Sequence, residues 1–134
     1  QAQAAAEQQA REEAARKAER ERVARETAAM KELDALLSRW NDASKIAGAT
    51  SRIALAGPVS NLQNLKREAE NLAMPECLDG GGASLVKSMD NTVQAYLVFM
   101  RNELSLGSKL AQLWFEDATK SMDKYKESRA ACET

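Results

Sequence analysis

The chain has 134 residues, of which 44% are hydrophobic and 29% are charged, and its net charge is −1 at pH 7. This composition is typical of one soluble domain, and it lacks the basic domain or stripe of a nucleic-acid-binding protein. The chain contains no histidine, which excludes Ser-His-Asp and Cys-His triads and a Glu-x-x-His di-iron site. We therefore expect a protein that is not an enzyme, with no metal or other cofactor and no nucleic-acid partner.

Residues 1–29 consist mostly of Ala, Glu, Arg and Gln, all strong helix formers. Acidic and basic residues recur four apart with the acid first, as in Glu7 and Arg11, which favours a helix. Val23 is the only apolar residue larger than Ala in this stretch. Residues 1–29 are therefore predicted to form a solvated helical spacer, with a weak coiled coil along an alanine seam as the alternative.

From residue 30 onward apolar residues recur three and four apart, which predicts a helical bundle domain over residues 30–134. The first helix is expected to continue from the spacer without a break and to end near Ala47. The second begins either at Pro58 or at Ser51, with a kink at the proline in the latter case. No segment alternates with period two over a useful length, so the predicted fold class is all-α.

The remainder of the chain allows two topologies. The segment from Pro75 to Gly82, which ends in three consecutive glycines, predicts a loop that acts as a flexible connector, and a helical apolar pattern follows it. Gly107 and Ser108 match a helix stop followed by a helix start. A turn there gives an up-down four-helix bundle with an extended N-terminal helix. This is the preferred topology, because the apolar residues beside the turn then bury one another. The alternative is three helices, the last running continuously over residues 84–132.

The four-helix topology places the two cysteines at the same end of the bundle, because the second and fourth helices run in the same direction. Cys77 and Cys132 are therefore a disulfide candidate, provided that their Cα atoms come within about 7 Å. A continuous last helix would hold them too far apart. The candidate pair motivates a periplasmic, oxidising location, and a cytoplasmic protein with two buried thiols is the alternative.

Four aromatic residues flank the expected turn: Tyr96, Phe99, Trp114 and Phe115. They form either part of the bundle core or a partner- or ligand-binding site at the hinge end, since interfaces favour aromatic side chains. Phe99 and Phe115 lie off the main apolar stripe, so we expect these two to be the most exposed.

Several segments of the chain resemble a group of uncharacterised bacterial envelope-anchored helical proteins. They are the run from Arg52 to Val59, then Pro75-Glu76-Cys77, then Met89-Asp90, and the run from Tyr96 to Met100. The resemblance spans roughly residues 33–125. It implies a helical domain behind a lipid or membrane anchor and a periplasmic location, and it brings no known activity and no functional residues.

The leading hypothesis is a non-catalytic protein-binding or scaffold module of the bacterial cell envelope, with another protein as its partner. One alternative is a small-molecule or lipid-sensing helical bundle, and another is an inhibitor or immunity protein. Contact with a membrane is expected only through a segment ahead of Gln1. A homo-oligomer stays open as a further arrangement.

Overall fold

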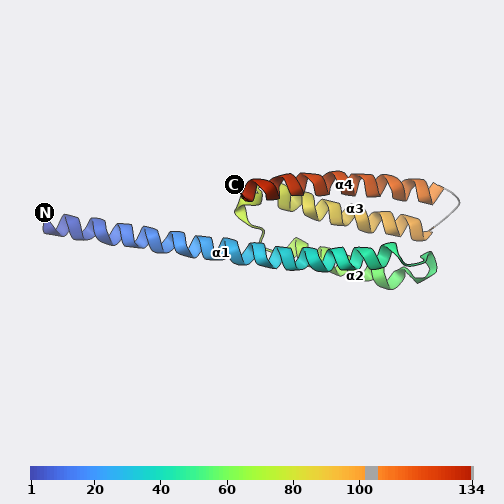
Figure 1. Ribbon diagram of the computed structural model, residues 1–134, viewed down its shortest axis with the longest axis horizontal. Helices are drawn as coiled ribbons and strands as arrows, with labels where there is room; N and C mark the ends of the chain where they lie inside the picture. The colour runs from blue at the N-terminus through green and yellow to red at the C-terminus, as the bar shows by residue number, and fades with distance from the viewer. Residues whose placement is uncertain (102–105, 134) are drawn as a thin grey trace.

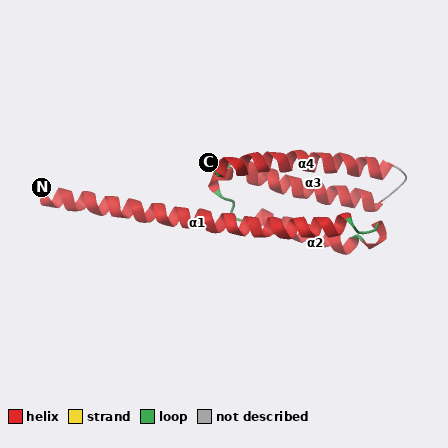
Figure 2. Cartoon of the chain, viewed as in Figure 1, coloured by secondary structure: helices red, strands yellow, loops and turns green. Residues whose placement is uncertain are grey.

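The computed structural model describes residues 1–101 and 106–133, and these residues confirm the all-α fold (Figure 2). The helices within them are α1 (Ala2–Gly48), η1 (Arg52–Ala54), α2 (Ala56–Asn71), η2 (Glu76–Leu78), α3 (Gly81–Arg101) and α4 (Leu106–Cys132), where η marks a 3₁₀ helix. Figure 1 shows an up-down four-helix bundle in which α1 runs antiparallel to α2 and α3 runs antiparallel to α4. The N-terminal half of α1 projects from it.

The chain reverses direction between α3 and α4, so the continuous helix over residues 84–132 is wrong and the four-helix topology is confirmed. The position expected for the turn is also wrong. Gly107 and Ser108 belong to the first turn of α4, which begins at Leu106, and residues 102–105 ahead of it lie outside the described residues. A glycine in a helix costs only about 1 kcal/mol, so Gly107 does not need to end one.

α1 is one continuous helix with two environments. Residues 1–25 are all exposed, and at about 1.5 Å per residue they form an arm about 36 Å long. Glu26 and Ala29 are already half-buried, so contact with the bundle begins about one turn before residue 30. The buried face of the remaining part is the one expected from the sequence: Leu33, Leu36, Trp40, Ala43 and Ala47.

The second helix begins at neither of the two expected positions. A 3₁₀ turn spans Arg52–Ala54, and α2 then starts at Ala56 with Pro58 in its first turn. Proline is tolerated there because the first N–H groups of a helix have no partner within it. The backbone N–H of Val59 already donates to the carbonyl oxygen of Leu55, at 2.9 Å, so Pro58 neither starts the helix nor kinks it.

The core is formed by side chains from α1, α2 and one face of α3, together with Tyr125 of α4. Its fully buried members are Leu33, Leu36, Leu55, Leu62, Leu78, Leu85, Met89 and Val93. Each such side chain contributes about 1.5–3 kcal/mol relative to an exposed position. Leu78 belongs to η2, so the short segment between α2 and α3 is held down by a core residue of its own.

α3 and α4 pack against each other along a face of small residues. Gly81, Ser88 and Ala95 recur every seven residues on α3, and Ala111 and Ala118 recur on α4; all five are buried. A seven-residue repeat keeps the same face of a helix against its neighbour, and small side chains allow a short interaxial distance. The hydroxyl of Ser88 donates to the carbonyl oxygen of Ala118 at 2.7 Å, which shows how closely the two backbones approach.

The connection expected over residues 75–82 does lie between α2 and α3, but it ends at Gly80 and contains the 3₁₀ turn η2, so the prediction is wrong for its last two glycines. Gly81 and Gly82 are buried in the first turn of α3. A Cβ atom at Gly81 would lie 2.4 Å from the Cβ of Ser128, and one at Gly82 would lie 2.7 Å from the Cγ of Met74. These two glycines are therefore required by close packing, whereas Gly80 has no neighbouring atom within 4 Å of such a position.

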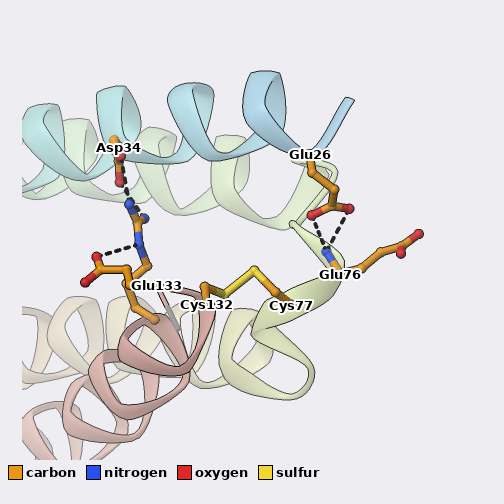
Figure 3. Close-up of a disulfide and its surroundings, with 7 residues drawn as sticks. Glu26, Asp34, Glu76, Cys77, Cys132 and Glu133 are labelled. Carbon is orange, nitrogen blue, oxygen red and sulfur yellow. Dashed lines mark hydrogen bonds and ion pairs between the residues drawn. A yellow bond between two sulfur atoms is a disulfide. The ribbon is translucent and has the colours of Figure 1, made fainter. Parts of the chain in front are cut away.

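The two cysteines are paired, as expected from the topology. The sulfur atoms of Cys77 and Cys132 are 2.16 Å apart and the Cα atoms are 5.3 Å apart, at the end of the bundle from which the arm projects (Figures 1 and 3). The bond joins η2 to the last residue of α4 and closes a loop with a sequence separation of 55 residues.

Two polar contacts tie α1 to the same end (Figure 3). The backbone N–H of Glu76 donates to both oxygens of the Glu26 carboxylate, at 3.0 and 3.1 Å. Arg129 donates to both carboxylate oxygens of Asp34, at 2.7 and 3.0 Å. Hydrogen bonding to Asp34 raises the pKa of Arg129. Because this pair is bidentate and the Arg129 side chain is only 24% exposed, it holds α4 against α1 better than an open surface pair would.

Replacing Gly81 with alanine tests the close packing of α3 on α4. We expect Gly81→Ala to lower the free energy of unfolding by about 1–3 kcal/mol, because α4 must shift to admit the new methyl group. Gly80→Ala is the matched control, and its stability should stay close to that of the wild type. Urea unfolding measures both, and equal midpoints for the two variants would contradict the packing described here.

Removing the disulfide tests its contribution to stability. The double variant Cys77→Ser/Cys132→Ser is expected to lose about 2–4 kcal/mol, since the crosslink constrains the unfolded chain. Thermal unfolding of the double variant should match that of the reduced wild type. A thiol assay on denatured, unreduced protein from its native compartment should detect no free thiol, and two thiols per chain would show that the bond does not form there.

Candidate functional site

The aromatic residues singled out in the sequence lie at the end of the bundle opposite the disulfide (Figure 1). We call this the distal end; it comprises the end of α1, η1, the start of α2, the end of α3 and the start of α4. Tyr96 and Phe115 meet edge to face there, with ring centroids 5.1 Å apart and an interplanar angle of 86°. Such a contact contributes about 0.5–1.5 kcal/mol beyond the buried area, so it fixes the position of the Phe115 ring.

Arg52 holds Phe99 from the other side. Its guanidinium carbon lies 4.3 Å from the centroid of the Phe99 ring, and its Nε donates to the Phe99 carbonyl oxygen at 3.0 Å. These contacts tie η1 to the end of α3. Arg52 could not be predicted as a site residue, because its partner lies 47 positions away and no local sequence pattern indicates a contact of that range.

Phe99 and Phe115 line an open groove of about 400 Å³. The other lining residues come from the first turns of α4: Ser108, Ala111, Gln112, Glu116 and Thr119. Its volume lies within the range of about 300–1,000 Å³ found for ligand sites. We call it the aromatic groove.

The structure brings together three of the four expected site residues. Phe99 and Phe115 line the groove and Tyr96 supports it through its contact with Phe115, whereas Trp114 neither lines the groove nor makes such a ring contact. Trp114 precedes Phe115 by one position, which turns its side chain by about 100° around α4. The expected exposure holds for Phe115, at 36%, but not for Phe99, which is half-buried while Trp114 is 37% exposed. Phe99 is covered because Arg52 stacks on its ring.

A larger groove, of about 580 Å³, lies between α1 and α2. It is the weaker candidate because its charged side chains include an ion pair, in which Arg39 donates to Glu68 at 3.0 Å. The aromatic groove instead presents ring surface that is open to solvent. Aromatic surface of this kind is enriched in binding sites, so we select the smaller groove.

The chemistry available in the described part of the chain is limited. Residues 1–101 and 106–133 hold no group of three or more Cys, Asp or Glu residues arranged to bind a metal ion. Nor does this part contain a helix that is both long and apolar enough to cross a membrane. At the distal end, burial raises the pKa of the Tyr96 phenol.

In comparisons with protein-family models, curated proteins and solved structures, nothing matches this chain.

An alkaline titration tests the burial of the two tyrosines. Burial raises the pKa of both Tyr96 and Tyr125 above the usual 10.0, and the chain has no other tyrosine. Tyrosinate absorbance should therefore appear at higher pH in the native protein than in the urea-denatured protein. Because the folded state prefers the neutral phenol, this contribution to stability is complete below pH 10 and is lost as the pH rises through the raised pKa. Coincident titration curves in the two states would show that both phenols are exposed.

Proposed function

We propose that this chain is a non-catalytic protein-binding or scaffold module of the bacterial cell envelope, and that its aromatic groove receives an apolar side chain of a partner protein. The observation that carries the proposal is an open groove walled by two phenylalanine rings, Phe99 and Phe115. In protein interfaces a few residues carry most of the free energy of association, and aromatic side chains are enriched at such surfaces.

The groove is organised before a partner binds. The Phe115 ring is positioned by Tyr96 and the Phe99 ring by Arg52, and these residues stand on helices or on the short turn η1. A site whose side chains are already ordered loses little conformational entropy on binding. This arrangement favours specific recognition over a chance exposure of apolar surface.

A protein partner fits the groove better than a small molecule. Sites for small molecules generally bury 70–90% of the ligand surface, and they need walls on most sides. The aromatic groove is open along its length and is lined largely from one helix, α4. When a side chain of a second protein occupies the groove, the rest of that protein would cover the side that is open to solvent.

The exposed arm supports the scaffold role. Over residues 1–25 it carries ion pairs along its own length, between Glu7 and Arg11 at 3.9 Å and between Glu19 and Arg22 at 2.7 Å. Hydrogen bonding to Arg22 lowers the pKa of Glu19. Such pairs stabilise a solvated helix, so the arm suits a spacer that keeps the bundle at a distance from its N-terminal attachment.

The disulfide supports the envelope location. Bonds of this kind persist in oxidising compartments such as the bacterial periplasm and are rare in the cytosol. The pairing of Cys77 with Cys132 therefore favours the periplasmic side of the envelope over the cytoplasmic alternative. The resemblance to envelope-anchored proteins supports the same location.

Site-specific photo-crosslinking tests the proposal. A photoreactive residue at Gln112, which lines the groove, should give a defined protein adduct in native cells. The same residue at Lys124, exposed on the same helix but outside the groove, is the matched control and should give none. Phe115→Ser in the Gln112 background should abolish the adduct, because it removes one wall of the groove.

Two outcomes would overturn the proposal. One is equal adducts from positions 112 and 124, and the other is an adduct that survives Phe115→Ser. Thermal unfolding of the Phe115→Ser protein is part of the test. The variant is expected to stay folded and to lose about 1–2 kcal/mol, since it gives up the ring contact with Tyr96 and some buried area.

A further inference from the structure

Three exposed apolar side chains form one patch on α4. Leu110, Leu113 and Trp114 are 44%, 57% and 37% exposed. At about 100° per residue, Leu110 lies between the other two around the helix axis, and all three fall within an arc of about 100°. Single exposed apolar residues are common on soluble proteins, whereas a contiguous group is typical of an interaction surface. We call these three residues the α4 patch.

The α4 patch is separate from the aromatic groove. None of its three residues lines that groove. Leu113 and Phe115 are two positions apart, so their side chains leave the helix in directions that differ by about 160°. A partner on the α4 patch would therefore leave the aromatic groove open, and the two surfaces can be tested independently.

The charges beside the α4 patch are arranged symmetrically about Leu113. Lys109 precedes Leu113 by four positions and Asp117 follows it by four. Each lies about 6 Å from Leu113 along the helix and is rotated from it by about 40°, in opposite directions. Both side chains are exposed, and neither takes part in an ion pair in the described part of the chain. The patch thus lies between one unpaired cation and one unpaired anion.

This arrangement is complementary to a second copy of itself. In a two-fold symmetric interface, the contact of residue i with residue j is matched by a contact of j with i. A two-fold axis through Leu113, perpendicular to the helix, makes the α4 helices of two copies antiparallel. Position 109 of each copy then lies opposite position 117 of the other, so both charges are paired. An anionic lipid surface would instead attract Lys109 and repel Asp117.

We propose that the α4 patch binds a second copy of this chain, through an antiparallel pair of α4 helices centred on Leu113. Lys109 of each copy would pair with Asp117 of the other, on both sides of the contact between the two leucines. α4 runs from the distal end toward the end from which the arm projects (Figure 1), so the two arms would point in opposite directions. This inference goes beyond the proposed function because the partner is the chain itself, and the dimer would hold two N-terminal attachments apart.

Sedimentation equilibrium of the oxidised full chain tests the proposal. A standard interface has about 20–30 residues on each side, and the α4 patch with its two charges is smaller, so we expect a dissociation constant on the order of 10–100 μM. Leu113→Ser should raise this constant about ten-fold or more, because the apolar contact is lost from both copies. Val23→Ser removes a side chain on the arm that is 48% exposed. It is the matched control and should dimerise like the wild type.

Charge reversal tests whether the partner is a second copy. Lys109→Asp places like charges opposite each other at both contacts of the dimer, and Asp117→Lys does the same. Each variant alone should dimerise about ten-fold more weakly than the wild type. An equimolar mixture of the two should return close to the wild-type affinity, because both contacts of the mixed dimer join opposite charges. Within one chain the two positions are about 12 Å apart, so an intrachain pair cannot explain the recovery.

A short bismaleimide crosslinker tests the antiparallel register. Leu113→Cys places two thiols together on the two-fold axis, so the crosslinker should join two chains while the native disulfide stays intact. Lys120→Cys is the matched control, because seven residues later the side chain lies on the same side of α4. Its two copies would be about 21 Å apart along the paired helices and should not be joined.

Three results would overturn the inference. The first is a folded, oxidised wild-type chain that stays monomeric up to about 1 mM, which would assign the α4 patch to a different partner. The second is a mixture of the two charge variants that associates no more tightly than either variant alone. The third is crosslinking that is as efficient from position 120 as from position 113.

Discussion

The short distance between α3 and α4 is the constraint on which the rest of the structure depends. It exists because buried glycine, serine and alanine residues meet along the interface, with the Ser88 hydroxyl bonded directly to the Ala118 carbonyl. This packing fixes the register of α4. The register in turn carries Cys132 to within bonding distance of Cys77, and it sets Phe115 against Tyr96 at the other end.

The two ends of the bundle are consequently very different. At one end a disulfide, a bidentate ion pair and a carboxylate that accepts from the backbone of η2 connect three helices. At the other end the contacts are a ring pair and a cation stacked on a ring, and apolar side chains stand in solvent. Stability is thus concentrated away from the surface that we propose to be functional, which leaves that surface free to be shaped by binding.

The features that follow from helical periodicity could be predicted from the sequence. The all-α class, the unbroken first helix and its buried face all depend on spacings within a few residues. The pairing of the cysteines could also be predicted, because it needs only the direction of each helix. The positions at which α2 and α4 begin could not be predicted from the sequence. Pro58 and Gly107 are each tolerated inside a first helical turn, so neither residue marks a helix boundary.

The missed features depend on contacts between distant segments. The roles of Gly81 and Gly82 become clear only when Ser128 and Met74 are placed beside them. Arg52 and Phe99 meet at the distal end, yet 47 positions separate them in the sequence. The aromatic cluster was only partly predicted, because the apolar stripe of each helix says nothing about which neighbour covers a given ring.

α1 begins in solvent and ends in the core without a joint, so the arm cannot swivel independently of the bundle. The buried residues of α1, from Leu33 to Ala47, therefore set the direction in which the arm leaves the bundle. The length of the arm and the orientation of its first residue about the helix axis are also coupled. Each residue added to the arm lengthens it by about 1.5 Å and rotates its start by about 100°. Among short insertions, those of 7 or 11 residues come within about 20° of a whole number of turns and would best preserve the direction in which the arm presents whatever it carries.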